Sequence, residues 1–99
     1  MDNIFLGKYC IVRTRSAGVF AGEVASLEAG NCLIHNSRRL WYWDGAASLS
    51  QLSQEGVKRP QNCKFPCEVP AHFVFEVIEI LPCTEKAIES IKEVKVWEE

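Results

Sequence analysis

Residues 31–45 read NCLIHNSRRLWYWDG, and we expect the fold to be organised around this stretch. It combines the apolar residues of a strand with two adjacent arginines, two of the three tryptophans and one of the two histidines. Burying a polar side-chain group costs free energy unless the group has a hydrogen-bond partner. Such a mixture is therefore not typical of a strand that is buried on both faces. The stretch therefore predicts a strand that holds the fold on one face and meets a ligand or partner on the other.

Outward from this stretch, alternation of apolar and polar residues predicts an antiparallel meander. The expected strands are 8–15, 19–27 and 32–43, with turns at 16–18 and 28–31. Gly22 interrupts the second strand and predicts a bulge or a close backbone approach. Asn36 and Ser37 are weak strand formers, so a bend or bulge is expected between the two halves of the third.

The second half of the chain predicts two helices and one more strand. Asp44 is expected to cap a helix over 46–55, and Thr84 a final helix over 85–95. Between them lie an irregular, exposed loop at 57–71 and a strand over 72–81. The order β-β-β-α-β-α predicts one α+β domain over 1–99. Its expected core is a small, strongly bent antiparallel sheet or an SH3/Sm-like open barrel with a C-terminal helix.

Composition narrows the class of partner. The chain of 99 residues has 11 basic and 13 acidic side chains, a net charge of −2, without the basic stripe of a duplex nucleic-acid binder. The longest apolar run, near 73–81, is broken by Glu76 and Glu79, and no signal peptide is recognisable. We therefore expect a cytoplasmic protein that binds neither duplex nucleic acid nor membrane. An open barrel leaves unpaired edges, which favours a homo-oligomer.

The five cysteines are expected to be free thiols, since cysteine is among the most buried residue types. Cys63 and Cys67 form one loose pair, with His72 as a conceivable third ligand. Zinc sites usually show two tight pairs, so no metal and no cofactor are predicted, although the sequence leaves metal binding at Cys63 and Cys67 open.

Arginine and aromatic residues suggest what kind of ligand the protein binds. Guanidinium forks bind phosphate oxygens, indole rings stack on bases, and a small turn presents backbone amides. The candidate ligand-binding residues are Arg13, Arg15, Ser16, Asn36, Arg38, Arg39, Trp41 and Trp43. Alternatively, the aromatic residues form core or a subunit interface, and the arginines pair with Glu23, Glu76 or Glu79. The same composition also marks protein–protein hot spots. No catalytic constellation is recognisable, so an enzyme is not expected.

Two blocks carry a resemblance to known proteins: residues 12–22, VRTRSAGVFAG, and residues 36–43, NSRRLWYW. With a further match near 78–83, they resemble a family of small, uncharacterised phage and prophage proteins. The resemblance implies a compact accessory protein of the kind that phages use against host defence. Such a protein would sequester an anionic nucleotide immune signal as a sponge, or would inhibit a host defence protein by binding it directly.

Overall fold

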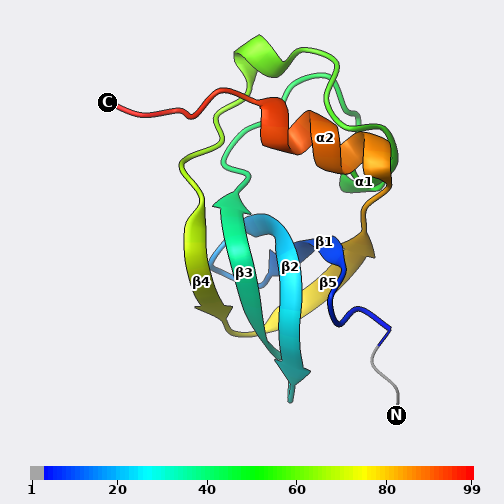
Figure 1. Ribbon diagram of the computed structural model, residues 1–99, viewed down its shortest axis with the longest axis vertical. Coiled ribbons are helices and arrows are strands. Elements are labelled where there is room, and N and C mark those ends of the chain that lie inside the picture. Colours follow the sequence, from blue (N-terminus) through cyan, green and yellow to red (C-terminus); the bar gives the residue numbers. More distant parts are fainter. Residues whose placement is uncertain (1–3) are drawn as a thin grey trace.

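Five antiparallel strands form one sheet in the order β4-β3-β2-β1-β5, and two α-helices pack on one of its faces (Figure 1). The computed structural model describes residues 4–99, so residues 1–3 of the predicted 1–99 domain lie outside the described residues. The strands are β1 (Tyr9–Thr14), β2 (Val19–Glu28), β3 (Asn31–Arg39), β4 (Val69–Val74) and β5 (Val77–Pro82). The helices are α1 (Leu49–Glu55), the 3-10 turn η1 (Pro60–Asn62) and α2 (Glu85–Glu93).

The sheet bends so far that its two edges meet at one corner. β4 and β5 lie at opposite edges of the strand order, yet only Phe75 and Glu76 connect them. At this corner the Arg15 amide donates to the Glu76 carbonyl (3.0 Å) and the Val77 amide donates to the Gly30 carbonyl (2.8 Å). The sheet stays open and is not a closed barrel. This α+β architecture confirms the predicted fold class.

The single strand predicted over 72–81 is in fact the pair β4 and β5. Glu76 adopts a φ of +55°, a left-handed conformation that turns the chain. The prediction was wrong because apolar residues continue through the corner, without the Gly, Pro or Asn that usually marks a turn.

A bulge bends β3 where it was predicted. Asn36 has a φ of +52°, and the register between β2 and β3 shifts between Ala21 and Glu23. Gly22 lies opposite: a Cβ there would be 2.8 Å from the His35 carbonyl oxygen, so the backbones approach closely, as its interruption of the strand predicted. β3 ends at Arg39, four residues before the predicted end, because the chain then leaves the sheet towards α1.

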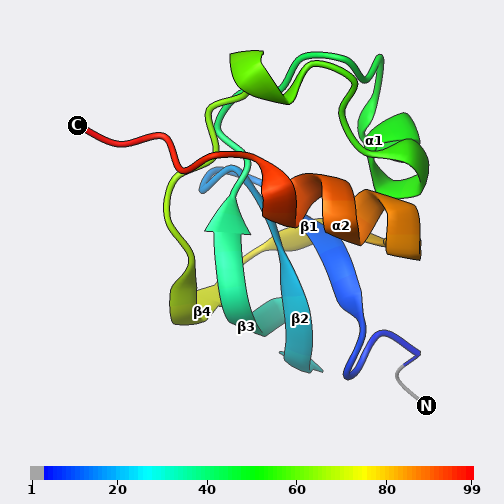
Figure 2. The same ribbon diagram turned by 45° about the horizontal axis from the view of Figure 1, so that its top comes forward.

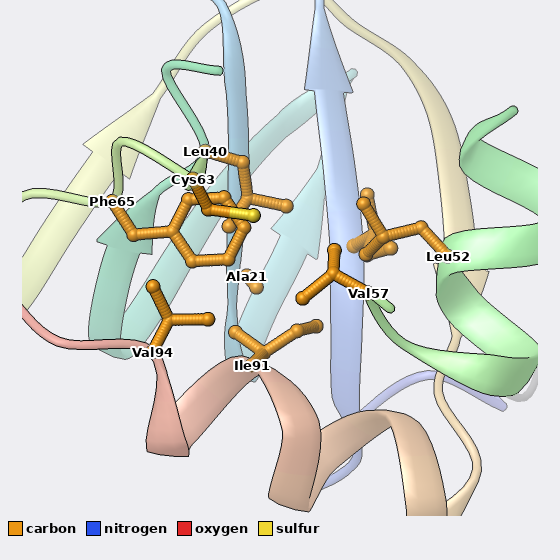
Figure 3. Packing of buried hydrophobic residues seen from close by; sticks show 9 residues of the cluster. Ala21, Leu40, Leu52, Val57, Cys63, Phe65, Ile91 and Val94 are labelled. Atoms are coloured by element: carbon orange, nitrogen blue, oxygen red, sulfur yellow. The ribbon is translucent and has the colours of Figure 1, made fainter. Parts of the chain in front are cut away.

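Buried apolar residues form one cluster on each face of the sheet. The helix-side cluster joins the sheet to both helices and to the 57–65 segment (Figures 2 and 3). It consists of Ile11, Ala21, Leu40, Leu52, Val57, Cys63, Phe65, Ile91 and Val94. The sheet-only cluster on the other face consists of Cys10, Val12, Phe20, Val24, Cys32, Ile34 and Val74.

The two helices begin at side-chain caps. The Thr84 hydroxyl accepts from the Ala87 amide (3.1 Å), which confirms the predicted start of α2. α1 begins later than predicted, since Ser48 and not Asp44 is its cap and accepts from the Gln51 amide (3.1 Å). No helix within residues 4–99 is long and apolar enough to cross a membrane.

The irregular segment after α1 takes part in the core. Val57, Cys63 and Phe65 are buried, so the expectation of an exposed loop is wrong for these residues. Phe65 lies next to Leu40, Cys63 and Val94 in the helix-side cluster, so this segment is held against the sheet (Figure 3).

Candidate functional site

Arg38 is buried in the interior, with only 5 % of its surface exposed. Its guanidinium donates to four backbone carbonyls: Pro66 (2.9 Å), Phe65 (3.1 Å), Ile91 (2.7 Å) and Val94 (2.6 Å). Two of these acceptors lie at the C-terminal end of α2, where a cation is favoured.

This environment makes Arg38 a structural residue and not a ligand fork. Burial lowers the pKa of its guanidinium, and the four charge-assisted hydrogen bonds compensate for the lost hydration. Four of its five N–H groups already donate to carbonyls, so a phosphate could bind here only by displacing those carbonyls. The predicted role of Arg38 in ligand binding is therefore corrected.

Arg39 lies on the opposite face of β3. Its cross-strand neighbour is Phe20 of the sheet-only cluster, and the guanidinium carbon stands 4.7 Å from the centre of that ring. Nη1 donates to the Ala17 carbonyl (2.9 Å), so Arg39 also holds the β1–β2 turn. Phe20 in turn meets His72 edge-on, with ring centres 4.6 Å apart.

Arg13 and Arg15 each lie beside a carboxylate near the β4–β5 corner. Arg13 Nη1 is 3.4 Å from Glu79 Oε1, and Arg15 Nη1 is 3.9 Å from Glu76 Oε2. These are two of the ion pairs that the sequence offered as the alternative to ligand binding. Both pairs are exposed to solvent, where such contacts contribute little to stability.

The remaining predicted ligand residues lie apart from one another. Ser16 is exposed in the β1–β2 turn, Asn36 is exposed at the β3 bulge, and Trp43 packs against the helix-side cluster. Trp41 is 62 % exposed and follows β3.

These placements do not form one pocket. Arg13 is paired across from Val19, which packs on the helix-side cluster, whereas Arg39 is paired across from Phe20 of the sheet-only cluster. Cross-strand partners share a face, so the two guanidiniums point to opposite sides of the sheet. Arg38 is buried on the helix side of the sheet.

Three exposed aromatic residues, Trp41, Tyr42 and Trp97, lie on backbone segments that are hydrogen-bonded to the 64–65 segment. The amides of Trp41 and Tyr42 both donate to the Lys64 carbonyl (3.2 and 3.3 Å), and Tyr42 and Lys64 form an antiparallel bridge. The Trp97 amide donates to the Phe65 carbonyl (3.0 Å), and Lys64 Nζ stands 5.6 Å from the centre of the Trp97 ring. We call Trp41, Tyr42, Lys64 and Trp97 the aromatic surface.

The aromatic surface is exposed to solvent, although three of its four residues have large aromatic side chains. Tyr42 is 50 % and Trp97 is 47 % exposed, in addition to Trp41. A groove of about 750 Å³ adjoins it, and Trp97 forms part of the groove wall with Pro60 and Gln61 of η1. Figure 1 shows the C-terminal segment leaving α2 beside η1. Tyr42, Lys64 and Trp97 are not among the ligand-binding residues predicted from the sequence, although an aromatic residue adjoins Trp41 and an indole lies beyond the predicted last helix.

A polar clamp holds the segment between β3 and η1. Asp44 accepts from Arg59 Nε through Oδ1 and from Asn62 Nδ2 through Oδ2, both at 2.8 Å. The hydrogen bond from Asn62, and then that from Arg59, lower the pKa of the Asp44 carboxyl. Cys63 Sγ lies against the carbonyls of Asp44 and Arg59, and Cys67 is exposed. Within residues 4–99 no three His, Cys, Asp or Glu side chains are grouped to hold a metal ion.

The fold and the surface together define a small α+β domain built on an open five-stranded sheet with an exposed aromatic surface. The sequence model of a protein family described as Domain of unknown function (DUF6948) matches residues 7–91, and the chain belongs to this family. Neither a curated protein nor a solved structure matches the chain.

Proposed function

We propose that the protein is a non-enzymatic binding protein that acts by holding another protein at the aromatic surface. The observation that carries this proposal is the exposure of two of the three tryptophans, Trp41 and Trp97, and of Tyr42. Tryptophan and tyrosine are enriched among the residues that dominate protein–protein binding energy. Leaving two indoles in water has no benefit for the fold alone.

The resemblance to phage and prophage proteins gives the proposal its setting. The protein would act in the cytoplasm of the host cell as an accessory protein that blocks a defence protein by direct contact. Such a function needs a surface and no reaction, which agrees with the absence of a recognisable catalytic constellation in the sequence.

Sequestration of an anionic nucleotide is a second candidate with narrower support. Arg39 bonds Ala17 in the turn that also holds Ser16, so two of the predicted ligand residues share one corner. Arg15 lies in the same turn but beside Glu76, Arg13 is paired with Glu79, and Arg38 is occupied by carbonyls.

Site-specific photo-crosslinking tests the proposal. Replacing Trp41 by benzoylphenylalanine should give a crosslinked host protein in irradiated bacterial cells. The same replacement of Ile78, which is 55 % exposed at the far edge of the sheet, should not. Equal crosslinking at the two positions, or none at position 41, would contradict binding at the aromatic surface.

Calorimetry separates the two candidates. A panel of cyclic dinucleotides, cyclic trinucleotides and cyclic ADP-ribose isomers should bind more weakly than about 10 μM if the partner is a protein. Tighter binding that Arg39→Ala abolishes would instead favour the sponge, and conversion of the ligand would favour an enzyme.

A further inference from the structure

The outer edge of β4 is open along its whole length. Among the described strands only β3 pairs with it, and Val69, Pro70, Ala71 and Phe73 are exposed. Such an edge presents unpaired backbone N–H and C=O groups, which are a template for another strand. The occupant that satisfies them is an extended backbone.

The strand has few of the features that normally keep an edge free. Its sequence, VPAHFV, contains no charged side chain, and Pro70 is its one residue that disfavours pairing. The opposite edge, which β5 forms, is better protected from pairing, because Glu79 lies there beside Arg13 and the strand packs against α1. The two edges of the same sheet are therefore not equally protected.

We propose that the β4 edge binds the β4 edge of a second copy of this chain in antiparallel register, forming a two-fold symmetric dimer. Val69, Ala71 and Phe73 alternate along the strand and share one face. With Ala71 on the two-fold axis, Val69 of one copy stands opposite Phe73 of the other. The smallest side chain then meets itself, and each aromatic ring meets a smaller residue.

The same register continues beyond the strand. It sets the exposed Cys67 opposite Phe75, whose ring lies 5.1 Å from that of Phe73. The Phe73–Phe75 pair, half or more exposed in the single chain, would be covered.

Charge does not oppose this arrangement. No charged residue lies within either β4, so the paired strands bring no like charges together. Glu68 precedes β4 and comes next to the corner of the second copy, where Arg15 and Glu76 form an exposed ion pair. This dimer goes beyond the proposed function and leaves the aromatic surface free.

Measurement of the molar mass in solution tests the dimer. Light scattering after size exclusion should give twice 11.2 kDa for the protein and 11.2 kDa for Ala71→Lys, which places two like charges on the axis. Ile78→Lys, a change at an exposed position of the other edge, should remain dimeric. A monomeric wild-type protein, or a dimer that Ala71→Lys leaves intact, would overturn the proposal.

A cysteine variant covers the case in which Ala71→Lys fails to fold. In a Cys67→Ser background, Ala71→Cys should form an intermolecular disulfide on mild oxidation, because only a residue on the axis meets itself. Ile78→Cys in the same background is the control. No disulfide at position 71, or as much at position 78, would overturn the proposed register.

Discussion

At the scale of single residues, Arg38 joins three parts of the chain that are far apart in sequence. Its acceptors belong to residues 65–66 and 91–94, and its own backbone belongs to β3. One side chain thus holds the sheet, the irregular segment and the end of α2 in one arrangement. The arginine fork suits this task because its donors point in several directions within one plane.

Replacing Arg38 should therefore destabilise the whole fold. Arg38→Met leaves buried carbonyls without donors and should lower the free energy of unfolding by about 2–4 kcal/mol, measured by chemical denaturation. Arg13→Met, at an exposed ion pair, should cost less than about 1 kcal/mol. Equal losses in both variants would show that the four bonds are not the source of the effect.

His72 should make stability depend on pH. Burial, and then the nearby Arg39 cation, lower the pKa of His72 below its usual 6.5 in the folded protein. Below pH 6.5 the unfolded chain takes up a proton more readily than the folded one, so stability should fall as the pH drops. The loss should level off once the pH passes below the folded pKa.

Denaturation midpoints between pH 7.5 and 5 measure this effect. His72→Gln should flatten the curve in this range, whereas His35→Gln, at an exposed position of β3, should keep the wild-type slope. A slope that survives in His72→Gln would assign the pH dependence to another group.

At the scale of elements, the bulge at which the register between β2 and β3 shifts depends on Gly22. A Cβ at this position would be 2.6 Å from Ile34 Cγ2 as well as close to two backbone carbonyls. Gly22→Ala should therefore cost about 1–3 kcal/mol through crowding, measured as a shift of the denaturation midpoint.

The matched control is Gly30→Asn in the β2–β3 turn. Gly30 has open space around it and a φ of +79°, which Asn tolerates better than most residues. This variant should lose less than Gly22→Ala. The opposite ranking would mean that backbone strain in the turn, and not the approach of β2 to β3, limits stability.

The sequence predicted those elements that depend only on neighbouring residues along the chain. Alternation gave the three N-terminal strands, Asn36 gave the bulge and Thr84 gave the start of α2. The helix start at Asp44 failed because Arg59 and Asn62 occupy that carboxylate, and Ser48 caps α1 instead. These partners come from η1 and its flank, which no local pattern connects to position 44.

The candidate site was harder to predict for the same reason. The sequence shows that Arg38 and Arg39 are adjacent, and strand geometry sends them to opposite faces. What each guanidinium then meets depends on distant backbone: carbonyls at the end of α2 for Arg38, and the Phe20 ring for Arg39. The composition of a polar cluster therefore did not determine whether it binds a ligand.

At the scale of the whole molecule, one sheet separates two apolar clusters. The helix-side cluster depends on α2 through Ile91, and the sheet-only cluster depends on β3 through Ile34; both side chains are fully buried. Strands β1 to β4 contribute buried residues to the clusters, and Val77, Ile80 and Leu81 of β5 pack against them, so loss of either cluster would disrupt the sheet.

The two clusters should therefore unfold together. Ile34→Ala and Ile91→Ala should each cost about 2–5 kcal/mol, with an unchanged dependence on denaturant concentration. Tryptophan fluorescence and far-ultraviolet circular dichroism should report one coincident transition in both variants. Separate transitions in Ile91→Ala would show that the helices can detach from a surviving sheet.

The corner at Phe75 and Glu76 also bears on how the chain is made on the ribosome. β1 emerges well before β5, with which it pairs through Cys10 and Pro82 and through Arg13 and Glu79. Until β5 has been synthesised, β1 has a neighbour on one side only. During that interval one side of β1 is an exposed edge, the kind of edge to which chaperones bind and from which aggregates grow.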